Sequence, residues 1–256
     1  MTESAALIES LRRIAAVGMP VGAARPDDAW LDRGLARAQY HELYTTDAED
    51  APSGAGFAIA LALAADALPM MWLRTEADER AGGRLHGAGL AEIGLMPDAL
   101  VLAVVADEPA LLRAAADAAR CPGLGTLLIE ARGRAAGFDL TATRRLMLAA
   151  ERSGVTAICL RIAAMPVPSA AATRWQVCAA ASAALEAGAP GRPAFDIECL
   201  RRRGGAAGSR WRVEWNRDAK TFIPLHSAAA LSGAGLSLAL DRTVARDPRS
   251  PVRRSR

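Results

Sequence analysis

The chain has 256 residues, 52% of them apolar and 4% aromatic, which is enough to bury one substantial core built mainly from alanine and leucine. No apolar run approaches the about 20 residues that a membrane-spanning helix needs, and the N-terminus lacks the basic start and apolar stretch of a signal peptide. These observations exclude a membrane protein and predict a cytoplasmic location. The formal net charge is +3, but residues 1–199 carry −6 and residues 200–256 carry +9. This asymmetry predicts an acidic partner, nucleic acid or protein, for the C-terminal part, or else a solvated basic tail.

The first predicted element is an amphipathic helix over residues 3–16, within an N-terminal segment that spans residues 1–30. Leu7, Leu11 and Ile14 line one apolar face of this helix. The face predicts a docking element for a partner or for another copy of the chain. An intramolecular cap on the core is the alternative.

Buried strands and helices alternate along the next part of the chain. Predicted strands cover residues 39–44, 69–75, 99–105, 125–131 and 155–162, and predicted helices cover residues 54–67, 107–121 and 139–153. The strands are apolar without period-two alternation, so both of their faces should be buried. This order of elements predicts an α/β fold with a mostly parallel sheet, right-handed crossovers and helices on both faces.

A small-residue segment, Ser53, Gly54, Ala55 and Gly56, follows the first predicted strand and opens a helix. Phosphate-binding loops lie at such positions, because the free N–H groups of a helix N-terminus bind anions. Their pattern requires Lys followed by Ser or Thr, but Ala55 and Gly56 stand there, and Lys220 is the only lysine of the chain. We interpret the segment as a degenerate phosphate loop that has lost its chemical groups.

The C-terminal part of the predicted core, which we place at residues 31–225, alternates apolar and polar residues. This period predicts antiparallel strands at one edge of the sheet, with a hairpin at the sequence GGAAG. Trp211 and Trp215 share one face of the last of these strands. That face either covers the sheet edge or forms an exposed binding patch, since Trp is frequent in such patches.

The predicted tail, residues 226–256, ends in RDPRSPVRRSR, with two prolines and five arginines. Such a sequence predicts a flexible basic arm. Arg249, Arg253 and Arg254 are candidates for binding a partner or DNA.

The four cysteines, Cys121, Cys159, Cys178 and Cys199, are far apart in the sequence and show no zinc-binding spacing. We therefore expect buried, reduced thiols and no metal site. The three histidines have no acidic or serine partner at a readable spacing, so none is a predicted catalytic base.

From about Leu31 to Phe222, the order of these pieces resembles RecA, and more closely the ImuA family, the RecA-like accessory proteins of bacterial SOS mutagenesis. The segments HELY, LTATRRLMLAAERSGVTA and AAATRWQV carry the resemblance in combination. It implies a RecA-like core in which Glu76 matches the catalytic glutamate and Glu130 matches the Walker B acid. Arg161 or its neighbour stands where RecA has its sensor glutamine.

The resemblance implies a non-catalytic adaptor of translesion DNA synthesis without a cofactor. Its implied partners are ImuB, a catalytically inactive Y-family-like polymerase, and an error-prone C-family DNA polymerase, with RecA as a further candidate and DNA contacted indirectly. The segments GRAAGFDL and AAMPVPSAAATR are shorter than the two segments with which RecA grips DNA. The alternatives are a cell-division inhibitor of the SulA type and an ATP-dependent recombinase paralogue.

Overall fold

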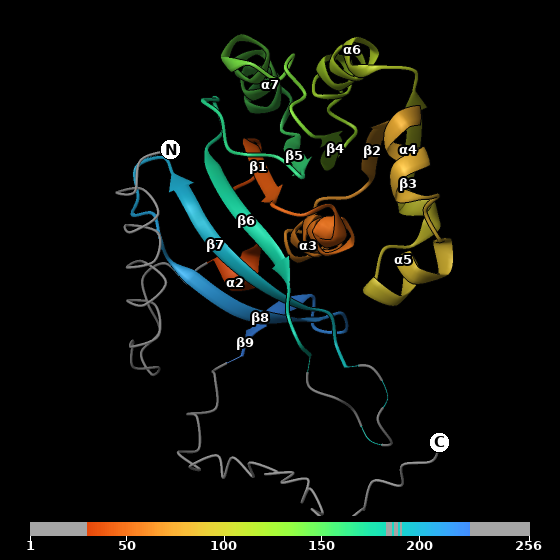
Figure 1. Cartoon of the computed structure of the whole chain (residues 1–256), viewed down its shortest axis with the longest axis vertical. Helices are drawn as coiled ribbons and strands as arrows, with labels where there is room; N and C mark the ends of the chain where they lie inside the picture. Colours follow the sequence, from red (N-terminus) through yellow and green to blue (C-terminus); the bar gives the residue numbers. More distant parts are fainter. Residues whose placement is uncertain (1–29, 183–185, 187–188, 190, 226–256) are drawn as a thin grey trace, which may run out of the picture. The chain divides into compact units, whose positions relative to one another are not determined.

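The computed structural model describes residues 30–182, 186, 189 and 191–225, all of which fall within one compact unit (Figure 1). The predicted N-terminal helix and the predicted tail lie outside the described residues. The same is true of six predicted partner-binding residues, namely Leu7, Leu11, Ile14, Arg249, Arg253 and Arg254. None of the helices in the described part has the length and apolar character that crossing a lipid bilayer requires.

Within the described residues, nine strands form one sheet in the order β3-β2-β4-β5-β1-β6-β7-β8-β9. The strands from β3 to β6 in this order are parallel, and β7, β8 and β9 extend the sheet in antiparallel fashion beyond β6. The bounds are Tyr40–Thr45 for β1, Met70–Thr75 for β2, Leu100–Val105 for β3, Thr126–Arg132 for β4, Thr156–Ile162 for β5, Thr173–Ala179 for β6, Ala194–Arg202 for β7, Arg210–Asn216 for β8 and Thr221–Pro224 for β9. The predicted α/β fold with antiparallel edge strands is confirmed.

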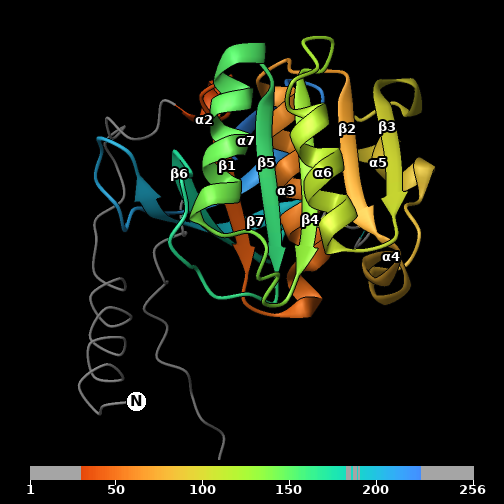
Figure 2. The same cartoon turned by 90° about the horizontal axis from the view of Figure 1, so that it is seen from above.

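Helices cover both faces of the sheet, α3 on one face and α6 and α7 on the other (Figures 1 and 2). The helices are α2 (Trp30–Arg33), α3 (Ala51–Ala64), α4 (Glu76–Gly82), α5 (Gly87–Ile93), α6 (Glu108–Ala118) and α7 (Leu140–Ser153), and the short 3₁₀ turns are η3 (Ala48–Asp50) and η4 (Pro97–Ala99). Each face has its own hydrophobic cluster. Leu146 and Ala150 of α7 are buried in one cluster, and Phe57 and Leu61 of α3 are buried in the other.

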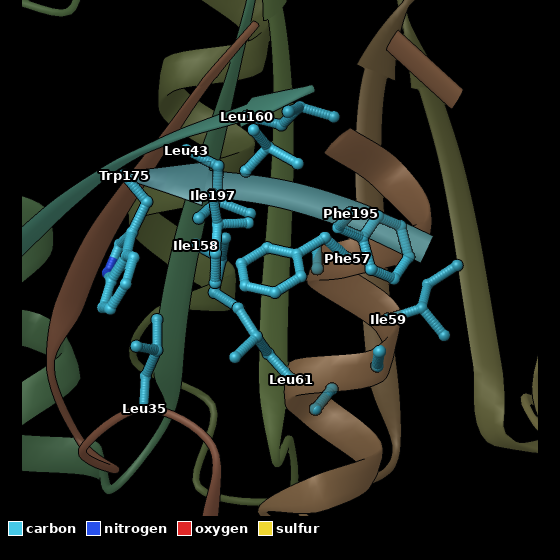
Figure 3. Packing of buried hydrophobic residues seen from close by; sticks show 14 of the residues in the cluster. Leu35, Leu43, Phe57, Ile59, Leu61, Ile158, Leu160, Trp175, Phe195 and Ile197 are labelled. Atoms are coloured by element: carbon cyan, nitrogen blue, oxygen red, sulfur yellow. The ribbon is translucent and has the colours of Figure 1, made fainter. Parts of the chain in front are cut away.

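The cluster under α3 contains most of the aromatic side chains. Figure 3 shows Phe57 of α3 pointing toward the sheet between Ile158 and Phe195. Trp30 lies with its ring centroid 5.2 Å from that of Trp175 and 5.5 Å from that of Trp211. The low aromatic content is thus concentrated where the antiparallel strands meet α2 and α3.

This packing corrects the expectation that Trp215 binds a partner. Its side chain is 1% exposed, its Nε1 donates to the carbonyl oxygen of Ile93 at 2.8 Å, and its ring lies 5.1 Å from that of Phe222. Trp211 is half-buried. The tryptophan face of β8 therefore packs into the hydrophobic core, and Trp215 is not part of an exposed binding patch.

Strand β3 differs from the prediction that both of its faces are buried. It is an edge strand that pairs only with β2, and its Val101, Leu102 and Val104 are 47%, 40% and 37% exposed. The apolar sequence is that of an interior strand, but nothing in the described residues covers its outer side. The apolar run alone could not distinguish the two positions.

The structure adds two helices and corrects one prediction. Helices α4 and α5 lie between β2 and β3, in a segment for which we made no prediction; the local signal is the pair Thr75 and Asp78, which form a capping box at the start of α4. Cys121 is exposed and Cys178 is half-buried, so only Cys159 and Cys199 are the buried thiols that we expected.

Candidate functional site

Ligands of open α/β sheets bind at the carboxyl ends of the parallel strands. Of the six residues predicted there, Ser53, Gly54, Ala55 and Gly56 lie after β1, Glu76 follows β2, and Glu130 lies near the end of β4. The strands therefore bring the predicted site to one edge of the sheet. The local geometry decides what that edge can bind.

The segment after β1 is helical where a phosphate loop would be open. η3 begins at Ala48, and α3 begins at Ala51, three residues before the predicted start of the helix. The N–H of Ala51 donates to the carbonyl oxygen of Ala48, and the N–H of Asp50 donates to that of Asp47 at 3.3 Å. These donors are used inside the turn, so they do not point outward at an anion.

The same turn carries negative charge. Asp47, Glu49 and Asp50 lie between β1 and α3, and Asp47 and Glu49 are exposed. Asp50 accepts a hydrogen bond from the N–H of Ala179 at 2.8 Å. Three carboxylates at this point repel a phosphate, which adds to the loss of the lysine.

Gly54 and Gly56 lie inside α3 and serve the packing of this helix. A Cβ atom on Gly54 would lie 2.7 Å from Cδ1 of Leu160 and 2.8 Å from Cγ2 of Thr45. Gly54 therefore lets the first turn of α3 approach β1 and β5 closely. A Cβ atom on Gly56 would meet Cδ1 of Ile93 at 3.4 Å, which is ordinary contact. The expected turn is thus corrected to a helix that rests on the sheet.

Glu130 is bound by its neighbours instead of facing a ligand. Its Oε1 lies 3.1 Å from Nη2 of Arg74, and its Oε2 accepts a hydrogen bond from Nε1 of Trp72 at 3.1 Å. Arg132 lies on the other side, with Nη2 at 4.0 Å from Oε1. We name Trp72, Arg74, Asp78, Glu130 and Arg132 the Arg74–Glu130 cluster.

Arg74 is itself 2% exposed and anchors the loop after α4. It donates to the carbonyl oxygens of Gly83 at 2.9 Å and Asp78 at 3.0 Å. Burial raises the pKa of Glu130, while the positive charge of Arg74 opposes that rise. Both carboxylate oxygens of Glu130 already have donors, so the acid that matches Walker B by resemblance forms a structural ion pair here.

The environment of Glu76 differs from that of the Arg74–Glu130 cluster. It occupies the first turn of α4, is exposed, and pairs with Arg80 at 3.7 Å on the helix surface. An exposed acid at this place has the weak interactions of a solvated helix residue. The two acids that match catalytic positions by resemblance are therefore one exposed side chain and one closed ion pair.

Arg161, which by resemblance lies at or next to the sensor position, is 1% exposed and holds the loop that follows β4. Its Nη2 donates to the carbonyl oxygen of Arg134 at 2.8 Å, and its guanidinium lies 5.5 Å from the ring centroid of Phe138. The Nε and Nη1 atoms have no hydrogen-bond partner among the described residues. The side chain thus stabilises the connection between β4 and α7.

A second buried polar network, which the sequence analysis missed, surrounds Glu42 of β1. Tyr40 and Tyr44 donate their hydroxyl protons to its carboxylate at 3.2 and 3.1 Å, and Nε of Arg174 donates at 2.8 Å. The sequence pattern that could have predicted this network is the alternation of residues along the strand, because the polar side chains of residues 40, 42 and 44 share one face. Like the Arg74–Glu130 cluster, this network leaves its acid fully occupied.

A groove of about 660 Å³ runs beside the first turns of α3. Ser53 and Gly56 line it together with Ile93 of α5, Phe195 of β7 and Arg217. Two of the predicted site residues are therefore at a surface hollow, but on the side of the helix and not at a free helix N-terminus. In the described part of the chain, no group of three His, Cys, Asp or Glu side chains is arranged to hold a metal ion.

No protein-family model and no curated protein matches the chain. Among solved structures it is similar to one described as the crystal structure of the RadB recombinase. The TM-score is 0.53 and the identity 12%, with 81% of this chain and all of that chain covered. This likeness, together with the strand order, shows that the chain has the fold of RecA-like recombinases.

Proposed function

We propose that this protein is a non-catalytic adaptor of the ImuA type that acts in SOS-induced translesion DNA synthesis. It bridges an ImuB-type inactive Y-family polymerase and an error-prone C-family DNA polymerase, with RecA as a further candidate partner. The family assignment comes from the resemblance of HELY, LTATRRLMLAAERSGVTA and AAATRWQV. The fold agrees with it but is shared by many other proteins.

The main support for a non-catalytic role is that the residues at the expected nucleotide site are already engaged in the fold. ATP hydrolysis requires charge compensation on the phosphates, which a lysine and a bound Mg²⁺ provide. Here α3 begins before the lysine position, and Arg74 binds the acid that would reach the metal.

The open edge of β3 supports a role in protein binding. Val101, Leu102 and Val104 are exposed on a strand whose outer backbone groups have no partner strand among the described residues. An uncovered apolar edge of this kind is a template for pairing with another chain. Monomeric proteins protect such edges with charges or prolines, and the sequence LVLAVV has neither.

The experiment is co-purification of the full chain with an ImuB-type protein and a C-family polymerase, with the bacterial division GTPase as the bait for a SulA-type role. We expect a stable complex with the ImuB-type protein, and a double substitution Val101→Lys/Val104→Lys should weaken it. Met165→Lys is the matched control, because Met165 is 75% exposed but lies in the loop between β5 and β6. Binding to the division GTPase alone would contradict the proposal.

Nucleotide turnover provides the second test. We expect no ATP hydrolysis above background with or without single-stranded DNA. Turnover that persists through purification and disappears in Glu76→Gln would show that the protein is an enzyme.

A further inference from the structure

We infer that the groove between α7 and the loop that follows α6 is a docking site for an acidic amphipathic segment of a partner protein. The two helices lie side by side on the outside of the sheet (Figure 2). The C-terminal half of α7 and the loop between α6 and β4 enclose a groove of about 420 Å³. Its lining residues are Arg120, Pro122, Arg145, Leu148, Ala149, Arg152 and Ser153. The inference rests on the charge and shape of this face, and it does not depend on the partners proposed above.

The charge of the groove is strongly positive. Arg120 pairs with Asp117 at 3.1 Å, but Arg145 and Arg152 form no ion pair with any described residue. Glu151, the neighbouring acid, lies 4.0 Å from Arg203 instead. The C-terminal helix dipole favours Arg152 at its position, but it acts only within the last turn and does not account for Arg145.

The floor of the groove is apolar. Leu148 is 38% exposed, although it lies on α7 one turn from Arg144, Arg145 and Arg152. Ala149 and Pro122 complete this floor. An exposed leucine surrounded by arginines is the arrangement of a binding hot spot, where an apolar anchor is inserted and charges hold the rim.

The floor offers almost no hydrogen-bonding group to a ligand. The hydroxyl of Ser153 donates to the carbonyl oxygen of Ala119 at 2.7 Å and accepts from the N–H of Val155 at 3.2 Å. Nucleic acid is bound through phosphates and base edges, and it has no aliphatic side chain to fill an apolar hollow. A protein segment with carboxylates on one side and a leucine or phenylalanine on the other matches both the rim and the floor.

The test uses the full chain and a fluorescein-labelled synthetic peptide with leucines at helical spacing i and i+4 and glutamates between them. Binding is followed by fluorescence anisotropy. Three further probes are the same peptide with every Glu changed to Gln, the same peptide with every Leu changed to Ser, and a 20-nucleotide single-stranded oligo(dT).

We expect the acidic apolar peptide to bind, and both altered peptides to bind at least tenfold more weakly. The double substitution Arg145→Glu/Arg152→Glu should weaken binding of the acidic peptide at least tenfold, and Leu148→Glu at least fivefold. Arg84→Glu/Arg134→Glu is the matched control, since both arginines are exposed outside the groove and form no ion pair in the described part. Its binding should change less than twofold.

Three outcomes would overturn the inference. One is equal binding of the acidic peptide and its glutamine counterpart, and another is unchanged binding by Arg145→Glu/Arg152→Glu. The third is binding of the oligonucleotide, lost in that variant, when the acidic peptide does not bind. Circular dichroism melting of each variant separates these results from unfolding, because all of the substituted side chains are at least partly exposed.

Discussion

Arg74 of the Arg74–Glu130 cluster and the groove residues Arg145 and Arg152 of α7 lie on opposite sides of one sheet and illustrate two uses of the same side chain. Arg74 is 2% exposed and contacts a carboxylate and two carbonyl oxygens. Arg145 and Arg152 are exposed and have no acidic partner among the described residues. A buried charge must be paired because its desolvation is costly, whereas an exposed one is stabilised by water until a partner displaces it. The first arrangement stabilises the fold, and the second is available for binding.

Among the substitutions that test this comparison, Arg74→Met should cause the largest change in the free energy of unfolding. Removing one partner of a buried ion pair leaves Glu130 without its main donor and should lower the free energy of unfolding by about 3–5 kcal/mol. The double substitution Arg74→Met/Glu130→Leu should recover at least half of that loss, because no buried charge is left unpaired. Arg145→Met is the control and should change the stability by less than about 0.5 kcal/mol. Urea unfolding measures all three, and a loss below about 1 kcal/mol in Arg74→Met would contradict the comparison.

His41 extends the comparison to a buried group without an acidic partner. It is 0% exposed, its Nε2 lies 2.8 Å from the carbonyl oxygen of Ala36, and its Nδ1 lies 2.8 Å from Oγ1 of Thr173. The carbonyl can only accept, so Nε2 carries the proton and Nδ1 accepts from the threonine hydroxyl. Burial lowers the pKa of His41 to about 4, because the protonated form would lose its hydration.

This shift predicts a loss of stability in acid. The unfolded chain binds the proton near the ordinary histidine pKa of about 6.5, so the contribution of His41 is fully present above that pH and disappears as the pH falls toward 4. Over this pH range the free energy of unfolding should fall by about 3 kcal/mol because of His41. His41→Gln should remove this part of the pH dependence, which the difference in unfolding free energy between the two proteins at pH 7 and at pH 4.5 measures. An equal difference at both pH values would show that His41 does not titrate in this way.

Alanine substitutions at Gly54 and Gly56 should have smaller effects on the free energy of unfolding, and they distinguish a helix that packs on the sheet from an open phosphate loop. Gly54→Ala places a methyl group within 2.8 Å of Leu160 and Thr45. We expect a loss of about 1–2 kcal/mol, because overpacking outweighs the gain in helix propensity. Gly56→Ala has room and should be neutral or stabilise the protein by about 0.5–1 kcal/mol. If both variants were equally stable in urea, the close approach of α3 to β1 would not require glycine at position 54.

The smallest effect is expected for Glu76→Gln, the counterpart of Glu130 by resemblance. Its only ion pair in the described residues is the exposed one with Arg80 at 3.7 Å. Such pairs contribute little, so the free energy of unfolding should change by less than about 0.5 kcal/mol. Glu130→Gln, measured beside it, should lose more than about 1 kcal/mol, since a buried charged hydrogen bond is weakened. A similar loss in both variants would show that the two acids do not differ as described.

The local elements could be predicted from the sequence because their signals are local. The helix predicted at residues 139–153 is α7, with Asp139 capping the N–H of Ala142 and Gly154 in the left-handed conformation after its end. Asp107 caps α6 in the same way. Apolar runs located the strands, and their alternation with helices predicted the mostly parallel sheet. Each of these signals lies within a few residues of the element that it specifies.

Other features depend on which distant segments meet, and only the tertiary structure decided them. Strand order placed β3 at the edge, so an apolar run typical of an interior strand is exposed there. The close contact of Gly54 with Leu160, across more than a hundred residues, fixed the first turn of α3 against the sheet. Glu130 has Arg74 as its partner because β2 and β4 are neighbours. No spacing in the sequence encodes such pairs, because they arise from the packing of the whole sheet.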